Sequence, residues 1–546
     1  MIRLCKRAKS KLFTACAAAS SILILMSGCS GTSQSSSPSK AQMSIGTVAI
    51  FTPDDGIDLT RKTPLSTWNI LVPEIIKSLK SKGFQDNTIT QKSSSSLSEQ
   101  SQAIQDYVVN QIAPLQKKQS GKNSSKTLQD IKKKISHTTL LVAPWTNKKG
   151  SNDYGDFATR PEAEDNSYNN NSKETTAETR FASALRLARE SGMHVVMLSK
   201  SINGFDPDVI FNLSTASRIG ELQAKTLVQK LALDRATSDD PKYIEVLLPC
   251  HNRHKPNNSS NKNSDTSNSD YDDDDYSSNN DFNDEFAKEA FKGIWKVLRP
   301  YFASGTLLSP SGYLDSQTEE EDWAKVAFDA DNPNAVKDEL TKRLKNHARN
   351  SNNLPKHIDG LITLNDQVAM QATSALENLG YQGSAADINP SITLPDVIGN
   401  FIGKKDIVKR PVPAPKKDAN NSEKSQNSDE KSSVHQQNDP EQAKRWPVMT
   451  GYGAYKETMP NIVNGKQWMT TIEDYQSIAK DIATTCASLN KTRKLSSSIK
   501  TIDTPSNTTK GKKIPTIVEP IMAVSATNLK ALLIDPGFIS MADAGL

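Results

Sequence analysis

The stretch HIDGLITLNDQVAMQATSALENLGY (residues 357–381) decides the fold class. A short apolar run ends at Asn365-Asp366, and a helix-like pattern follows at once, with a glycine close to its end. An apolar strand that leads directly into an amphipathic helix is typical of a parallel α/β sheet. The two polar residues between them have three interpretations at this point: a helix cap, a catalytic pair or the polar wall of a binding cleft.

The same alternation runs along most of the chain. Apolar runs predict strands at 45–51, 139–145, 194–199, 208–214, 243–249, 305–311, 360–365 and 446–451. Amphipathic patterns between them predict helices at 67–84, 178–193, 218–233, 284–305 and 367–381. Strands that are apolar on both faces and alternate with such helices favour doubly wound parallel sheets. The succession is too long for one sheet and predicts two similar lobes.

Polar tracts interrupt this pattern and explain the composition. The chain has 546 residues, of which only 35% are hydrophobic, and its mean hydropathy is −0.58. Residues 147–178, 252–281 and 404–445 are rich in Asn, Ser, Asp and Lys, and we expect them to be disordered surface insertions. The acidic run 271–275 lacks the glycine and distal glutamate of a calcium-binding loop, so it indicates a solvated loop.

The N-terminus has the features of an export signal. A basic start is followed by a short run of apolar and small residues at 12–26, too short for a stable membrane span. The run ends in Leu25-Met26-Ser27-Gly28-Cys29, which resembles the bacterial lipobox. We therefore expect a signal peptide at 1–28, lipidation of Cys29 and a Ser-rich tether at 29–44. The alternative is an ordinary signal peptide that contains a cysteine.

Cysteine usage and charge exclude several function classes. Beyond Cys29, only Cys250 and Cys486 remain, and the sequence does not decide whether they pair. The histidines show no metal-ligand spacing, and the net charge of +5 comes from basic residues scattered among acidic ones, so we expect no metal, cofactor or nucleic acid. No nucleophile elbow, phosphate-binding loop or zinc-protease motif occurs, which predicts a protein that is not an enzyme.

With the polar tracts removed, an ordered set of motifs remains: AIFTPDDG (49–56), the stretch 357–381, MTGYGAYKETMPNIVNGKQWMTTIEDYQSIAKDIA (449–483) and KGKKIPTIVEPIMAVSATNLKALLIDPGF (510–538). This set resembles the type I periplasmic solute-binding proteins, and among them the xylose- and multiple-sugar-binding branch of ABC importers. It covers most of residues 45–540 outside the insertions, and its strength lies in the order of the motifs rather than in any one of them.

This resemblance implies two Rossmann-like lobes with parallel sheets, joined by three hinge crossovers. The implied boundaries are 45–205 plus 474–512 for lobe 1, 206–473 for lobe 2, and 513–546 for the final hinge strand and C-terminal segment. It also implies a sugar held between the lobes, beyond the carboxyl ends of the strands, by polar side chains and an aromatic face. The candidate ligand-binding residues are Asp54, Asp55, Arg61, Trp145, Ser199, Lys200, Asn365, Asp366, Tyr452 and Glu473.

Two of these candidates have a structural alternative, and several positions depart from the family pattern. Trp145 is equally well read as an indole at the edge of the core, and Asp366 as the cap of the next helix. The departures are Ser199-Lys200 for Asp-Arg, Thr215-Ala216 for Asp-Asn, Gly453 for Asp and Glu473 for Lys. Each lost charge-assisted hydrogen bond to a sugar is worth about 1.5–3 kcal/mol, so we expect no tight binding of the family's usual sugars unless Tyr452, Glu473 and Trp145 replace the lost groups.

The resemblance therefore implies a monomeric lipoprotein on the extracytoplasmic face of the cell membrane. It would capture a mono- or oligosaccharide by hinge closure and deliver it to the permease of an ABC transporter. The alternative is a degenerate homologue that no longer imports and acts as a surface sensor or interaction protein.

Overall fold

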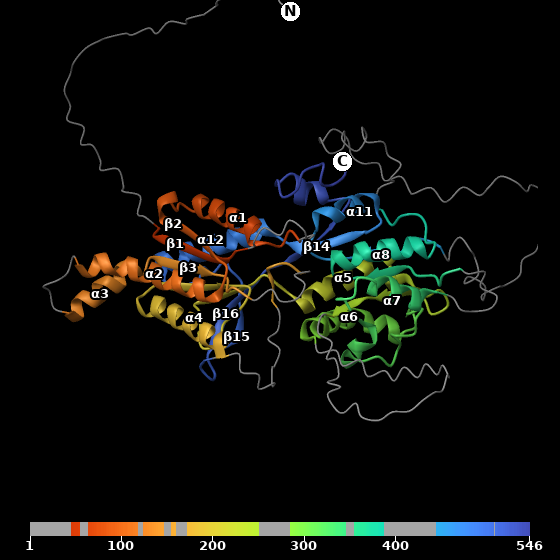
Figure 1. Ribbon diagram of the computed structural model, residues 1–546, viewed down its shortest axis with the longest axis horizontal. Helices are drawn as coiled ribbons and strands as arrows, with labels where there is room; N and C mark the ends of the chain where they lie inside the picture. Colours follow the sequence, from red (N-terminus) through yellow and green to blue (C-terminus); the bar gives the residue numbers. More distant parts are fainter. Residues whose placement is uncertain are drawn as a thin grey trace, which may run out of the picture. The chain divides into compact units, whose positions relative to one another are not determined.

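Two mainly parallel β-sheets, each with its own helices, make up the described part of the chain (Figure 1). The computed structural model describes residues 45–54, 64–117, 124–146, 154–159, 172–250, 284–345, 354–386, 444–506 and 508–546. The signal peptide, Cys29 and most of the three predicted insertions lie outside these ranges. Within them, no helix combines the length and apolarity that a membrane span requires.

The first sheet has seven strands in the order β15-β16-β6-β5-β3-β1-β2. Its strands are β1 (Thr47–Pro53), β2 (Ile89–Ser94), β3 (Thr138–Val142), β5 (His194–Leu198), β6 (Val209–Asn212), β15 (Ile502–Pro505) and β16 (Lys513–Val518). All neighbours are parallel except β15 and β16. β3 is buried along its whole length, as expected for a strand between two helical layers.

The second sheet has six strands in the order β10-β8-β12-β13-β14-β17. Its strands are β8 (Lys242–Val246), β10 (Leu307–Leu308), β12 (Gly360–Ile362), β13 (Val448–Thr450), β14 (Met469–Glu473) and β17 (Ile521–Ser525). Only β17 runs antiparallel to its neighbour β14. Two short ladders complete the strands: β4 (Ala158–Thr159) with β7 (Ser214–Thr215), and β9 (Leu248–Cys250) with β11 (Ala327–Asp329).

Helices accompany each sheet as the alternating pattern predicts (Figure 1). Those of the first lobe are α1 (Trp68–Ser81), α2 (Leu97–Lys117), α3 (Ser124–Ile135), α4 (Ser172–Glu190) and α12 (Tyr475–Thr492). Those of the second are α5 (Ala216–Leu231), α6 (Glu285–Ala303), α7 (Ala335–Leu344), α8 (Asp366–Asn378) and α11 (Met459–Asn464). Gly220 and Gly293 let α5 and α6 approach closely, since a Cβ at Gly293 would lie 1.9 Å from the carbonyl oxygen of Ser217.

Three connections pass from one sheet to the other, which confirms the predicted fold class. The chain leaves the first sheet after β6 and enters α5, returns from β14 into α12, and crosses again from β16 to β17. β6 belongs to the first sheet, whereas the sequence boundary at 205/206 assigned that segment to lobe 2. Crossovers at the carboxyl ends of strands bring the ends of both sheets to one place, and that is where ligands bind in open α/β folds.

One hydrophobic cluster reaches from the first sheet to the second. It contains Val48 and Ile50 of β1 together with Ile472 of β14 and Val524 of β17, all fully buried. A separate cluster lies between α5, α6 and β8, and Cys250 belongs to it, whereas Cys486 belongs to the first. Both cysteines are buried and free, so they do not pair.

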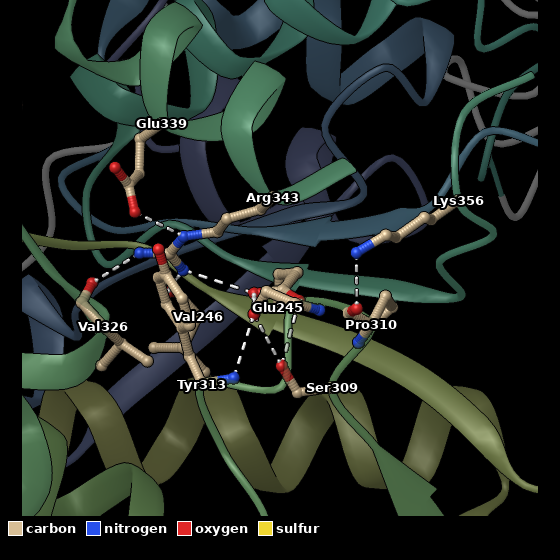
Figure 2. A network of polar contacts seen from close by, with 10 residues as sticks. Glu245, Val246, Ser309, Pro310, Tyr313, Val326, Glu339, Arg343 and Lys356 are labelled. Carbon is tan, nitrogen blue, oxygen red and sulfur yellow. Dashed lines mark hydrogen bonds and ion pairs between the residues drawn. The ribbon is translucent and has the colours of Figure 1, made fainter. Parts of the chain in front are cut away.

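A buried ion pair fixes the second lobe (Figure 2). Arg343 of α7 is 1% exposed. Its guanidinium donates to Glu339 Oε1 at 2.8 Å, to Glu245 Oε2 at 3.3 Å, and to the carbonyl oxygens of Val246 at 2.6 Å and Val326 at 3.0 Å. The carboxylate of Glu245 also accepts hydrogen bonds from Ser309 and Ser311. These hydrogen bonds link β8, α7 and the segment after β10. They also give each buried charge a partner, which offsets the cost of removing the charge from water.

We predict that Arg343→Ala lowers the free energy of unfolding by about 3–5 kcal/mol, because it leaves the Glu245 carboxylate buried without its cation. Urea unfolding of the two proteins measures this difference. The matched control is Arg299→Ala, since Arg299 and its partner Glu319 are both 55% exposed, and we expect a loss of about 0–1 kcal/mol there. Equal effects of the two substitutions would contradict the prediction.

Candidate functional site

The carboxylate of Glu473, the last residue of β14, is the centre of a polar network where the crossovers meet. Its Oε1 accepts a hydrogen bond from Tyr452 Oη at 2.6 Å, and its Oε2 accepts one from Ser66 Oγ at 2.7 Å. Ser214 Oγ lies 3.3 Å from Tyr452 Oη. All four residues are fully buried. Burial and the neighbouring carboxylate raise the pKa of Tyr452 well above its usual value, so the phenol keeps its proton and donates.

These residues come from both lobes. Ser66 lies just before α1 of the first lobe, Tyr452 follows β13 of the second, and Ser214 lies on the first crossover. A backbone hydrogen bond from Leu65 N to Gly453 O, at 2.8 Å, joins the same two segments. We name Ser66, Ser214, Tyr452 and Glu473 the joint, because their hydrogen bonds link the lobes through one buried carboxylate.

Asp366 lies beside the joint and holds the loops of the second lobe. Its backbone nitrogen donates to Tyr452 O at 3.0 Å. Its side chain accepts four hydrogen bonds, from Gln467 Nε2, Tyr455 N, Thr458 Oγ1 and Thr470 Oγ1. Burial raises its pKa to about 6, although these donors favour the charged form. The sequence interpretation of Asp366 as the helix cap is wrong, because its carboxylate is used to anchor these loops.

Asn365 is the residue that caps α8. Its Oδ1 accepts a hydrogen bond from Val368 N at 2.9 Å, which satisfies one of the free amides of the first helical turn. The side-chain nitrogen of Asn365 is buried and has no partner among the described residues. One end of the amide is therefore structural, and the other is a donor that remains available.

Four of the remaining predicted residues are described by the structure, and they belong to the first lobe. Asp54 is exposed at the end of β1, and Asp55 and Arg61 lie outside the described residues. Trp145 is half-buried after β3, and its indole packs against the first-lobe core, in line with the core-edge alternative. Ser199 is buried after β5 with a φ of 64°, and Lys200 is half-buried. Asn365, Asp366, Tyr452 and Glu473 are thus brought together, whereas the four described candidates of the first lobe lie at the ends of β1, β3 and β5.

The sequence reasoning missed Ser66, Ser214 and the buried Glu519 of the third crossover. Glu519 is 1% exposed, and its Oε1 has no partner among the described residues. Burial, with Asp481 and Asp474 nearby, raises its pKa to about 7, against the opposing effect of Arg218. The Glu-Pro pair at 519–520 was a usable signal for this residue, but a serine in an irregular segment carries none.

The space next to Glu473 is small. A cavity of about 40 Å³ there is lined by Glu473, Tyr475, Met522, Leu532 and Phe538 among others. This volume accommodates water, whereas pockets for small ligands measure roughly 300–1,000 Å³. The cavity lies between the start of α12 and the segment 531–538, and Tyr452, Asn365 and Asp366 are not among its lining residues. In the described ranges, no cluster of His, Cys, Asp and Glu side chains has the arrangement of a metal site.

Comparison with known proteins retrieves solute-binding proteins among solved structures. An ABC transporter solute-binding protein from Clostridium phytofermentans with bound β-D-glucose is 16% identical, with a TM-score of 0.43, and the match covers 91% of this chain and 99% of that one. A carbohydrate transporter solute-binding protein from Chloroflexus aurantiacus in complex with D-glucose is 16% identical, with a TM-score of 0.42 and coverages of 91% and 97%.

A periplasmic solute-binding protein from Actinobacillus succinogenes with bound D-allose is 11% identical, with a TM-score of 0.37 and coverages of 89% and 99%. No family model matches the chain, and no curated protein does. Identities and TM-scores at this level do not establish a family for it.

We predict that Tyr452→Phe lowers the free energy of unfolding by about 1–3 kcal/mol, because Glu473 Oε1 loses its donor while it remains buried. Tyr301→Phe is the matched control. Its hydroxyl donates to Asp234 Oδ1 at an exposed position, where water replaces the lost bond, so we expect a change near zero. Denaturant unfolding compares the two variants, and equal losses would contradict the role given to the Tyr452 hydroxyl.

We predict that stability falls as the pH rises from about 4.5 to about 7, in part through Glu519. The folded protein binds this proton more tightly than the unfolded chain, because the pKa is raised to about 7. The stabilisation is therefore full at low pH and is lost as the pH passes the folded-state value, a change of roughly 2–3 kcal/mol. Asp366, whose pKa is also raised, contributes in the same direction.

Glu519→Gln tests the share of this residue. The variant should lose less stability than the wild type between pH 4.5 and pH 7.5, as measured by urea unfolding at several pH values. The exposed Glu190 provides the control Glu190→Gln, which should leave the slope unchanged. If the free energy of unfolding of Glu519→Gln varied with pH as steeply as that of the wild type, Glu519 would not contribute to the pH dependence.

Proposed function

We propose that the chain is an extracytoplasmic solute-binding lipoprotein for carbohydrates that delivers its ligand to the permease of an ABC transporter. The observation that carries the proposal is the topology: three connections cross between two parallel α/β sheets where their strands end. In open α/β folds, ligands bind beyond the carboxyl ends of the strands. The resemblance of the sequence to the sugar-binding branch gives the class of ligand.

The side chains available at these strand ends suit a sugar. The free amide nitrogen of Asn365 is a donor for a hydroxyl oxygen, and Glu473 and Tyr452 together supply a carboxylate and a phenol. Trp145 lies at the end of β3 in the first lobe, half-buried against the core, and its indole is the candidate aromatic surface that this lobe would present to the C–H face of a pyranose ring. Planar polar groups with one aromatic surface are the usual means of sugar recognition.

Capture requires the joint to open. Glu473 accepts hydrogen bonds from Tyr452 and from Ser66, and all three side chains are fully buried. A sugar hydroxyl that replaces Ser66 or Tyr452 on the Glu473 carboxylate makes a charge-assisted hydrogen bond in their place. The ligand then favours whichever lobe arrangement gives it most contacts, which is the physical content of hinge closure.

The joint itself favours a second candidate function. Every oxygen of Glu473 already has a donor from the chain, and one hydrophobic cluster continues from the first sheet into the second. A protein whose lobes close on themselves needs no solute to become rigid. On this alternative the chain is a degenerate solute-binding homologue that serves as a sensor or interaction protein at the cell surface.

We predict that at least one of D-xylose, D-glucose and maltotriose raises the thermal stability of the protein. A ligand at 100 times its dissociation constant adds about 2.7 kcal/mol to the free energy of unfolding. A thermal-shift series over a range of sugar concentrations measures this effect, with D-mannitol as an acyclic polyol control. No shift with any of the three sugars would contradict carbohydrate capture and favour the second candidate.

For a sugar that binds, Asn365→Ser tests the site. The serine hydroxyl keeps the acceptor that caps α8, so the fold remains, while the amide donor is lost. We expect the affinity to be about five- to ten-fold lower, since one hydrogen bond to a ligand is worth about 1–1.5 kcal/mol. An unchanged dissociation constant would remove Asn365 from the ligand-binding residues.

We predict that cells that express the full chain incorporate radioactive palmitate into it, and that Cys29→Ala abolishes the label. The thioether at the cysteine of a lipobox carries the lipid, whereas the other cysteines of the mature chain, Cys250 and Cys486, are buried. Immunoprecipitation followed by autoradiography measures the label. A labelled Cys29→Ala protein, or an unlabelled wild type, would contradict the lipid anchor.

A further inference from the structure

Residues 154–159 lie within the polar tract 147–178, yet they are folded against both lobes. The sequence predicts disorder for the whole tract, and this part of the prediction is wrong. Tyr154 is 3% exposed and Phe157 is fully buried. The reason is local: two aromatic residues three positions apart bury more apolar area than the polar residues around them suggest.

The two aromatic side chains belong to different cores. The ring of Tyr154 lies 4.3 Å from that of Phe286 and 6.0 Å from that of Tyr452, both in the cluster of the second lobe. The ring of Phe157 lies 4.8 Å from that of Trp68 and 6.1 Å from that of Tyr475, in the first cluster. A segment of four residues therefore packs one side chain into the second-lobe cluster and one against α1 and α12 of the first lobe.

The backbone of the segment is tied to the start of α1. Asp156 N donates to Ser66 O at 2.7 Å, and Trp68 N donates to Asp156 Oδ2 at 3.3 Å. Gly155 has a φ of +66°, and a Cβ there would lie 2.5 Å from Ser66 O and 2.6 Å from Ser66 Cβ. Only glycine allows the segment this close to Ser66, whose hydroxyl donates to Glu473.

The end of the segment pairs with the first crossover. β4 (Ala158–Thr159) runs parallel to β7 (Ser214–Thr215), with Ala158 opposite Ser214 and Thr159 opposite Thr215. Ser214 is a member of the joint. The segment thus contacts three of the four joint residues or their immediate backbone: Tyr452 through Tyr154, Ser66 through Asp156, and Ser214 through Ala158.

We propose that residues 154–159 are an intramolecular strap that holds the two lobes together and closes the joint. In a hinged binding protein, a bound solute contacts both lobes. Here the strap makes such contacts itself, to Ser66 of the first lobe and to Tyr452 of the second. The contacts above support the strap independently of any ligand. Only the statement that a sugar must displace the strap rests on the proposed function. Strap and solute are then competitors for the joint.

Hydrogen exchange of the full chain, followed by mass spectrometry, tests the clamp. In the wild type, peptides that cover 154–159 and 64–68 should exchange at least about ten-fold more slowly than an unstructured chain, because their amides are bonded within the fold. Gly155→Val should remove this protection and also that of 451–455, since the side chain forces the strap away from Ser66. Unprotected exchange of 154–159 in the wild type would overturn the proposal.

Gly383→Val is the matched control. Gly383 has a φ of +89° and nothing within 4 Å of its Cβ position, so the substitution brings similar backbone strain without a contact to the joint. We expect unchanged protection of 154–159 and 451–455 in this variant. Loss of protection in the control equal to that in Gly155→Val would overturn the proposal.

Tyr154→Ala provides a second way to release the strap if Gly155→Val does not fold. It removes the ring from the second-lobe cluster and leaves the backbone bonds to Ser66 possible. Exchange at 451–455 should then rise while that of α8 stays slow. An unchanged hydrogen-exchange rate at 451–455 in a folded Tyr154→Ala protein would overturn the proposed strap.

A sugar titration separates this proposal from the proposed function. For a sugar that binds, Gly155→Val, or Tyr154→Ala in its place, should have a dissociation constant about ten-fold or more lower than the wild type. The reason is that the strap no longer competes with the sugar for the joint. Equal dissociation constants would overturn the competition between strap and solute. If D-xylose, D-glucose and maltotriose bind to neither protein, the proposed function fails, and the exchange result decides the strap by itself.

Discussion

The buried carboxylate of Glu473 is the constraint on which the arrangement of the two lobes depends. A carboxylate that is fully removed from water is costly unless it is hydrogen-bonded. Its two donors, Ser66 and Tyr452, come from different lobes. The carboxylate is therefore satisfied only when both lobes are present around it, and the continuous hydrophobic cluster from β1 to β17 adds apolar burial to the same arrangement.

This constraint changes how a hinged binding fold would work here. Where a solute bridges two lobes, the solute supplies the contacts of the closed state. In this chain Ser66, Tyr452 and the proposed strap supply them, so these contacts stabilise the closed arrangement of the lobes without a ligand. Under the proposed function, a sugar would have to replace hydrogen bonds that already exist, and its affinity would be the difference between two sets of contacts.

The fold was largely predictable from the sequence, and the reasons are visible in particular strands. β3, β5 and β12 are apolar on both faces and are followed by amphipathic helices, which few other architectures accommodate. β2 escaped prediction because it is an edge strand whose sequence, ITQKSS, is mostly polar and exposed. It forms a strand because it pairs with β1, and its own sequence pattern does not indicate this pairing.

The candidate site was less predictable, because its chemistry depends on which neighbours the fold brings together. Asn365 and Asp366 were both identified, but only the structure shows that the amide caps α8 and the carboxylate anchors the loops around Gln467. Ser66 and Tyr154 lie in irregular or polar segments, where no periodicity marks a buried residue. Long-range contacts gave these residues their roles, and a single sequence does not record such contacts.

A double-mutant cycle between Ser66→Ala and Tyr452→Phe tests the central claim most directly, with the free energy of unfolding as the readout. Both hydroxyls donate to the two oxygens of one buried carboxylate, so their losses should not be independent. The account predicts a coupling energy of about 1 kcal/mol or more, as for residues within one hydrogen-bond network. Additive losses, with a coupling near zero, would contradict a joint that links the two lobes through Glu473.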